Sequence, residues 1–86
     1  MVKGIIKINC PSGLHMRPVG VLCKKAMIYR SKVEFNYKSS EVNVKRVLSV
    51  LGACICAGEE VELVCDGPDE QEAYAYLSDL IENHLE

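Results

Sequence analysis

Alternating apolar and polar positions predict four β-strands. In the first strand, every second residue from Val2 to Ile8 is apolar or glycine, which gives the strand one apolar face. In the second, Val33, Phe35 and Tyr37 alternate with polar residues. A sheet built from such strands buries one face and leaves the other in water. The predicted strands are residues 2–9, 32–38, 41–44 and 59–65.

Apolar residues spaced three and four apart predict three helices. In residues 18–29, this spacing places Val19, Leu22, Cys23 and Ala26 on one stripe. A short second helix covers residues 46–51. The third helix starts at residue 69, and its inward stripe is Ala73, Leu77, Leu80 and Ile81.

Turn and capping residues set the predicted boundaries. Ser39-Ser40 is expected to turn the chain between the second and third strands, which form a hairpin. Gly52 is expected to cap the C-terminus of the second helix. Asp69 and Glu72 have the spacing of a capping box in its wider D-x-x-E sense.

The predicted order of elements is β-α-β-β-α-β-α. This order favours an α+β fold, a two-layer open-faced sandwich in which a four-stranded antiparallel sheet carries three helices on one face. A later strand is expected to lie between the two strands of the first β-α-β unit. The 86 residues are too few for more than one small core, so residues 1–86 are interpreted as a single domain.

Composition excludes several classes of function. The net charge of −2 argues against a nucleic-acid binder, because such proteins usually carry a marked basic excess. No apolar run reaches the length of a membrane span, and Met1-Val2-Lys3-Gly4 does not begin a signal peptide. A cytoplasmic protein that neither binds nucleic acid nor inserts into a membrane is therefore expected.

The five cysteines are interpreted as small hydrophobic residues, mostly buried, in a reducing compartment. Their odd number argues against a disulfide framework, and the C-x-C spacing is too tight for the usual paired zinc ligands. Metal or redox use remains the alternative, although neither a metal nor a cofactor is expected. The cysteines are Cys10, Cys23, Cys54, Cys56 and Cys65.

The segment from Ser12 to Pro18 carries the candidate chemistry. His15 and Arg17 lie two residues apart, and Pro18 suits the first turn of a helix. The free N–H groups and positive dipole at a helix start favour an anion. We therefore hypothesise that His15 carries a phosphoryl group. The alternatives are a capping or core role for His15 and a merely solvated charge for Arg17, while His84 has no motif around it.

With these residues in view, the sequence resembles HPr, the histidine-containing phosphocarrier of the bacterial phosphotransferase system. The family's active-site motif matches Gly13-Leu14-His15-x-Arg17-Pro18. Its other characteristic spacings match Val42-Asn43-x-Lys45, Leu51-Gly52, Gly58 and Gly67-x-Asp69-Glu70. The resemblance runs from about Lys3 to Leu85 and implies the sandwich fold already described.

The resemblance also implies a function and its site. His15 would accept phosphate on Nδ1 from enzyme I, which phosphoenolpyruvate charges, and pass it to the IIA component of a sugar transporter. The chain would be a monomeric carrier, not an enzyme. Arg17 would bind phosphate oxygens, with the N–H groups of Met16 and Arg17 and the hydroxyl of Ser12 as further donors.

The same resemblance places a docking surface for enzyme I and IIA beside the site. It consists of Met16, Gly20, Val47, Leu48 and Leu51. The alternative is that Val47 and Leu51 belong to the core. In so short a helix not every apolar side chain can turn inward, and we expect Leu48 to be the exposed one.

Arg46 departs from the family, which often carries a serine here that is phosphorylated by a kinase in many Gram-positive relatives. Arginine cannot accept that phosphate, and Ser49 is not an adequate substitute by sequence alone, so no regulatory serine is predicted. Arg46 is either neutral drift or a second cation that favours an acidic partner. This departure favours an alternative function, a regulatory or adaptor paralogue that acts by docking.

Overall fold

The computed structural model describes residues 1–11 and 13–85. Its strands are β1 (Val2–Lys7), β2 (Lys32–Tyr37), β3 (Ser40–Asn43) and β4 (Glu60–Asp66). Its helices are α1 (Met16–Ala26), α2 (Val47–Gly52), α3 (Glu70–Asp79) and a final π-helical turn, η1 (Leu80–His84). This order confirms the predicted sequence of strands and helices.

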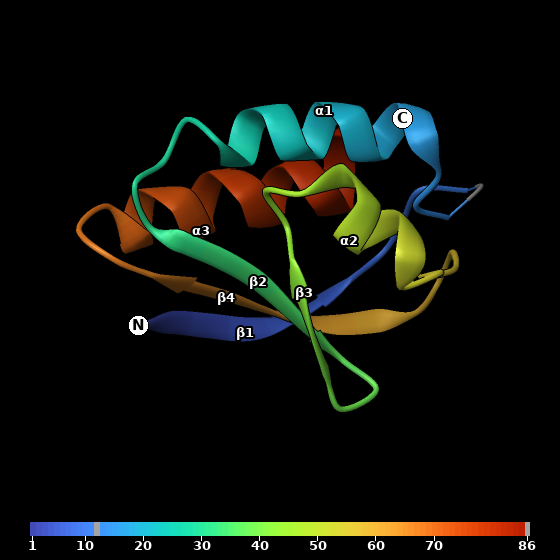
Figure 1. The fold of residues 1–86 in the computed structure, drawn as a ribbon, viewed down its shortest axis with the longest axis horizontal. Coiled ribbons are helices and arrows are strands. Elements are labelled where there is room, and N and C mark those ends of the chain that lie inside the picture. The colour runs from blue at the N-terminus through green and yellow to red at the C-terminus, as the bar shows by residue number, and fades with distance from the viewer. Residues whose placement is uncertain (12, 86) are drawn as a thin grey trace.

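The four strands form one antiparallel sheet in the order β1-β4-β2-β3. β4 pairs with β1 on one side and with β2 on the other, so the strand that comes last in the chain lies between the first two. All the helices cover one face of the sheet, and the other face is open (Figure 1). The predicted two-layer open-faced sandwich is therefore confirmed.

The core lies between the sheet and its helices. Val33 and Phe35 from β2 and Leu63 from β4 are almost fully buried, as their alternation predicted. The stripe of α1 faces the same core, while Ile5 lies on the opposite, open face and is 63% exposed. Across residues 1–11 and 13–85, helices long and apolar enough to cross a membrane are absent.

Several predicted boundaries are wrong by one to three residues. α1 begins at Met16, with His15 as its N-cap, and ends at Ala26, so Pro18 is its third residue. The proline still lies in the first turn, where its missing N–H costs no helical hydrogen bond. The hairpin turns at Lys38 and Ser39, one residue before the predicted turn. Both have positive φ angles (49° and 65°), as a type I′ turn requires.

The predicted C-cap at Gly52 is also wrong. Gly52 belongs to α2, and Ala53 is the C-cap. The left-handed conformation falls instead on Cys54, whose φ is 54°, and the Cys54 N–H donates to the carbonyl of Leu51. The left-handed residue that ends the helix therefore lies two residues later than the predicted cap at Gly52.

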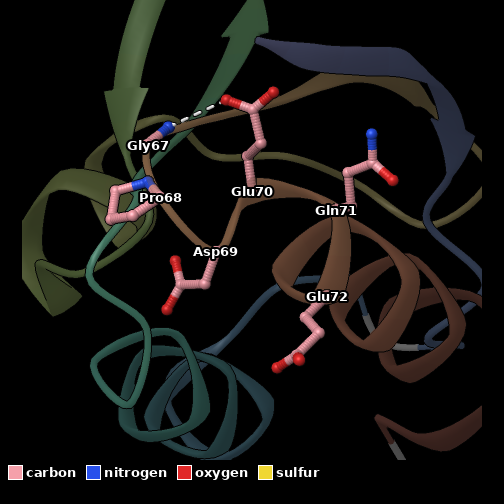
Figure 2. A pocket seen from close by; sticks show the side chains of 6 residues that line it. All are labelled: Gly67, Pro68, Asp69, Glu70, Gln71 and Glu72. Atoms are coloured by element: carbon pink, nitrogen blue, oxygen red, sulfur yellow. Dashed lines mark hydrogen bonds between the residues drawn. The ribbon is translucent and has the colours of Figure 1, made fainter.

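Asp69 does not form the predicted capping box. It is the N-cap residue of α3, but its carboxylate accepts hydrogen bonds from the N–H groups of Arg30 and Ser31 and from the Ser31 hydroxyl. Figure 2 shows Asp69 turned away from Glu70, which bonds back to Gly67. Gly67 is required here because a Cβ would lie 2.6 Å from the Ser31 Cα. The Asp69 carboxylate thus joins the α1–β2 connection to the start of α3.

Asp69→Asn should destabilise the fold in a pH-dependent way. The Ser31 hydroxyl and the two N–H groups favour the charged carboxylate and lower the Asp69 pKa from 3.8 to about 2. The stabilisation is therefore complete above about pH 4 and is lost as the pH falls towards 2. Thermal melts should show a deficit for Asp69→Asn at pH 7 that shrinks between pH 4 and 2.

Glu41→Gln is the matched control, since it removes the charge of an exposed carboxylate on β3. A deficit for Asp69→Asn that stays constant down to pH 2 would contradict the role given to its ionised form.

Candidate functional site

The start of α1 presents His15 to solvent. The backbone of His15 is extended (φ −110°, ψ −174°), and its carbonyl accepts the first helical hydrogen bond, from the N–H of Val19 at 3.0 Å. Its side chain is exposed and makes no capping hydrogen bond. Of the two structural alternatives, a core histidine and a capping imidazole, the structure shows neither. The imidazole is open to an incoming group.

The first turn of α1 leaves its N–H donors beside this imidazole. The N–H groups at the start of a helix have no partner within the helix. Since Pro18 has no N–H and Val19 bonds to the His15 carbonyl, Met16 and Arg17 supply the open donors of the turn. Together with the positive end of the helix dipole, they favour an anion close to His15.

Arg17 adds a full positive charge at the second position of α1. Its side chain is exposed, and no hydrogen bond or ion pair ties it to another residue of the described ranges. It is therefore available to bind a phosphate with two parallel N–H donors. Ser12, the remaining predicted phosphate ligand, lies outside the described residues.

The loop before His15 rests on the segment between α2 and β4. The Leu14 N–H donates to the Ile55 carbonyl at 3.0 Å, and the Leu14 side chain is buried. Gly13 has a φ of 76°, and a Cβ there would lie 3.1 Å from the Ile55 oxygen and 3.2 Å from the Cys56 Cα. Only glycine fits this contact without strain.

Nothing in the local sequence indicates this support. The positive φ of Gly13 was foreseeable from its place in a turn, but its partner was not, because Ile55 is distant in the chain.

Two exposed cysteines lie in the same segment, Cys54 and Cys56, whereas Cys10, Cys23 and Cys65 are buried. The prediction that the cysteines are mostly buried thus holds for three of the five, and the two exposed ones lie next to this loop. Among the described residues, no group of three or more His, Cys, Asp or Glu side chains is placed to hold a metal ion.

The predicted docking residues divide into two groups. Met16, Gly20 and Leu48 are exposed, and Leu48, at 82%, confirms the prediction that it points outward. Val47 and Leu51 are partly buried and pack against the core. A shallow hollow of about 570 Å³ lies at Arg46–Ser49, beside Leu48. The outer surface of α1 and α2 therefore carries exposed apolar side chains, and one of them, Met16, directly follows His15.

Charge is unevenly distributed along the chain, and the outer surface of α1 and α2 is positively charged as a result. The first 33 residues hold seven lysines and arginines and no acidic residue, whereas all twelve acidic residues follow. Neither α1 nor α2 contains an acidic residue, and Arg17, Lys24 and Arg46 are exposed on or next to them. This surface complements a partner with acidic groups around an apolar centre.

A second hollow, of about 550 Å³, lies at the other end of α1. It is lined by residues 67–72 (Figure 2), including the Asp69 carboxylate that bonds to Arg30 and Ser31 just beyond α1. Its acidic side chains do not suit a phosphate. The hollow is separate from the His15 site.

The start of α2 is held without a side chain from Arg46. Arg46 is the N-cap residue, and its side chain makes no capping hydrogen bond. The Asn43 side-chain oxygen accepts from the Lys45 N–H at 3.0 Å, and the Ser49 hydroxyl accepts from the Asn43 N–H at 2.9 Å. Asn43 and Ser49 thus fasten the turn, and the N–H groups of the first turn of α2 lack a capping side chain.

Comparison with known proteins gives consistent matches along the whole chain. The family described as "PTS HPr component phosphorylation site" matches residues 2–83. The phosphocarrier protein HPr of Buchnera aphidicola is 33% identical over 86 residues, which cover 100% of both chains. The crystal structure of HPr-C-His from Thermoanaerobacter tengcongensis superposes with a TM-score of 0.93 at 30% identity, covering 99% of this chain and 96% of that one.

A further similar structure carries a different name. The Bacillus subtilis catabolite repression protein Crh, solved as a dimer with a swapped domain, matches with a TM-score of 0.79 at 27% identity, covering 98% of this chain and 97% of that one. The fold is therefore shared by phosphocarriers and by a protein named for catabolite repression.

Arg46→Ser should stabilise the fold by up to about 1 kcal/mol. A serine hydroxyl at the N-cap accepts a hydrogen bond from the first turn of α2, which Arg46 does not do. The change also removes a cation from the unfavourable end of the helix dipole. Thermal melts should show a higher midpoint for the variant.

Arg46→Ala separates the two causes, because it removes the charge without adding a cap. If Arg46→Ser melts no higher than the wild-type protein, the capping argument is wrong.

Proposed function

This chain belongs to the HPr family of the phosphotransferase system, and we propose from that premise that it is a working phosphocarrier. It accepts a phosphoryl group on His15 from phospho-enzyme I and passes it to IIA components of sugar transporters. The observation that carries the proposal is the open imidazole at the start of α1, with free N–H donors and Arg17 beside it.

The transfer is a displacement at phosphorus. The Nδ1 lone pair of neutral His15 forms the new nitrogen–phosphorus bond, while the bond between phosphorus and enzyme I breaks and its electron pair returns to enzyme I. Arg17 and the N–H groups of Met16 and Arg17 stabilise the charge on the phosphoryl oxygens. In the second step the IIA protein is the nucleophile and His15 the leaving group. Ser12 is proposed as a further donor.

The exposed position of the site supports a role as a phosphoryl carrier over a role as an enzyme that binds its substrate in an enclosed pocket. A carrier gains nothing from holding phosphate tightly, since equal binding of the ground and transition states does not raise the rate. The single arginine suits that requirement, and the partner proteins supply the rest of the reaction. We propose that the carrier works in the cytoplasm and as a monomer, because the consecutive residues His15, Met16 and Arg17 supply the site without a residue from a second copy.

The docking surface for enzyme I and IIA is proposed to be centred on Met16, Gly20 and Leu48. Leu48 carries the most exposed apolar side chain of the three, and Val47 and Leu51 support it from the core side. Arg46 and Lys24 add positive charge on either side, so acidic residues are expected on the partner.

Phosphoenolpyruvate and enzyme I should label His15. The phosphorylated product should be acid-labile, as a phosphohistidine is, and absent from His15→Ala. Mass spectrometry of the intact protein and of its peptides, with acid treatment, measures both. Labelling that persists in His15→Ala would contradict the proposal that His15 accepts the phosphoryl group.

A wild-type protein that takes no label but still binds enzyme I would favour the second function, a docking or regulatory paralogue. Two observations support this second function: Arg46 and the similarity to Crh.

Leu48→Ala should weaken binding to enzyme I by roughly five- to tenfold, which corresponds to a loss of about 1 to 1.4 kcal/mol of binding free energy. The melting temperature should not change, because Leu48 is 82% exposed. Titration calorimetry measures the affinity. Ile5→Ala is the matched control, since Ile5 is also exposed but lies on the open face of the sheet. Equal losses for both variants would contradict the docking surface.

A further inference from the structure

Glu59, just before β4, connects the β2–β3 hairpin to the segment beneath His15. Its Oε1 accepts hydrogen bonds from the Tyr37 hydroxyl at 2.6 Å and from the Cys56 N–H at 2.8 Å. Its Oε2 lies 3.9 Å from the Lys38 Nζ. The carboxylate therefore contacts the end of β2, the turn of the hairpin and the turn that leads into β4.

The turn held by Glu59 is the same segment on which the His15 loop rests. Within it, the Glu59 N–H donates to the Cys56 carbonyl at 3.2 Å, and the Gly58 N–H donates to the Ile8 carbonyl at 2.8 Å. One residue before Cys56, the Ile55 carbonyl receives the Leu14 N–H. A continuous series of hydrogen bonds thus leads from Tyr37 through Glu59, Cys56 and Ile55 to the residue before His15.

The contacts of Glu59 favour its charged form. The Tyr37 hydroxyl and the Cys56 N–H both donate to the carboxylate, and they lower the Glu59 pKa below its usual range. Hydrogen bonds to a charged acceptor are about twice as strong as neutral ones. Cys56 is exposed, so water competes for its N–H, and a strong acceptor is needed to fix the turn. Cys54, in the left-handed region, lies in the same segment.

We infer that Glu59 is a positioning residue for phosphotransfer. By fixing the Cys56 N–H it holds residues 54–58, and this segment holds Gly13 and Leu14, which set the place of the His15 imidazole. Glu59 does not touch the phosphate in this role. The inference rests on the proposed phosphocarrier function. Its physical basis is that transfer between two proteins requires the reacting atoms to meet in line, so a loosened His15 loop spends less time in the reactive arrangement.

The test compares Glu59→Ala and Glu59→Gln with Glu62→Ala as the matched control. Glu62 lies on β4 and also accepts one side-chain hydrogen bond, from Asn36 at 2.8 Å, on the open face of the sheet. Its side chain makes no hydrogen bond or ion pair with the described residues 54–58. Glu59→Gln keeps an oxygen acceptor for the Cys56 N–H and loses only the charge.

Two measurements are made on each variant. The first is the rate of phosphotransfer from phospho-enzyme I, at saturating and at limiting carrier concentration. The second is hydrogen exchange of the Leu14 amide, whose acceptor is the Ile55 carbonyl. Exchange reports local opening without any phosphate present.

Glu59→Ala should lower the maximal transfer rate roughly tenfold, with little change in KM because the docking residues are untouched. The Leu14 amide should exchange roughly tenfold faster, while amides of the β1–β4 ladder keep their protection. Glu59→Gln should recover only part of both losses, because the acceptor oxygen stays and its charge is lost. Glu62→Ala should behave like the wild-type protein in both measurements.

Unchanged Leu14 exchange in Glu59→Ala would overturn the inference. A uniform rise in exchange at all amides would also overturn it, because that result indicates general destabilisation. If the wild-type protein accepts no phosphate, the proposed function fails by itself. Leu14 exchange then still decides whether Glu59 positions the His15 loop.

Discussion

β4 is the strand on which the rest of the structure depends. β1 and β2 have no hydrogen bonds to each other in the sheet, and each is held through its pairing with β4. The segment that enters β4 supports the His15 loop, and the segment that leaves it carries the Asp69 contacts to the α1–β2 connection. The central strand therefore fixes both ends of α1, the helix that carries the candidate site.

The site itself is built from backbone geometry as much as from side chains. Three consecutive residues, His15, Met16 and Arg17, supply an exposed imidazole, two open N–H donors and a cation, and all three depend on where α1 begins. A shift of the helix start by one residue would change which N–H groups are open. The Gly13 contact and the Leu14 hydrogen bond lie directly before that start, so they hold the backbone from which the imidazole and the N–H groups project.

Periodicity predicted the fold from the sequence, and the motif singled out His15 and Arg17, which the structure places exposed at the start of α1. The alternation of apolar residues around Phe35 and the helical spacing around Leu22 were enough to predict a strand and a helix, because each pattern repeats over the whole element. Local patterns failed where a side chain has a distant partner. Asp69 looks like a capping-box residue, but it binds Ser31, 38 residues away. Glu59 looks like an ordinary strand-edge charge, and only the structure shows its contact with Cys56.

The central place of β4 also has a consequence for synthesis of the chain. Because β4 follows β1, α1, β2 and β3 in sequence, the sheet cannot be completed until residue 66 has left the ribosome. Until then β1 and β2 each have an edge without the partner strand β4, and the core lacks the side chains of β4. Contacts between segments distant in the chain also form slowly. We therefore expect the nascent chain to stay unfolded for most of its translation, and to complete the sheet and the segment that supports His15 in the same late step.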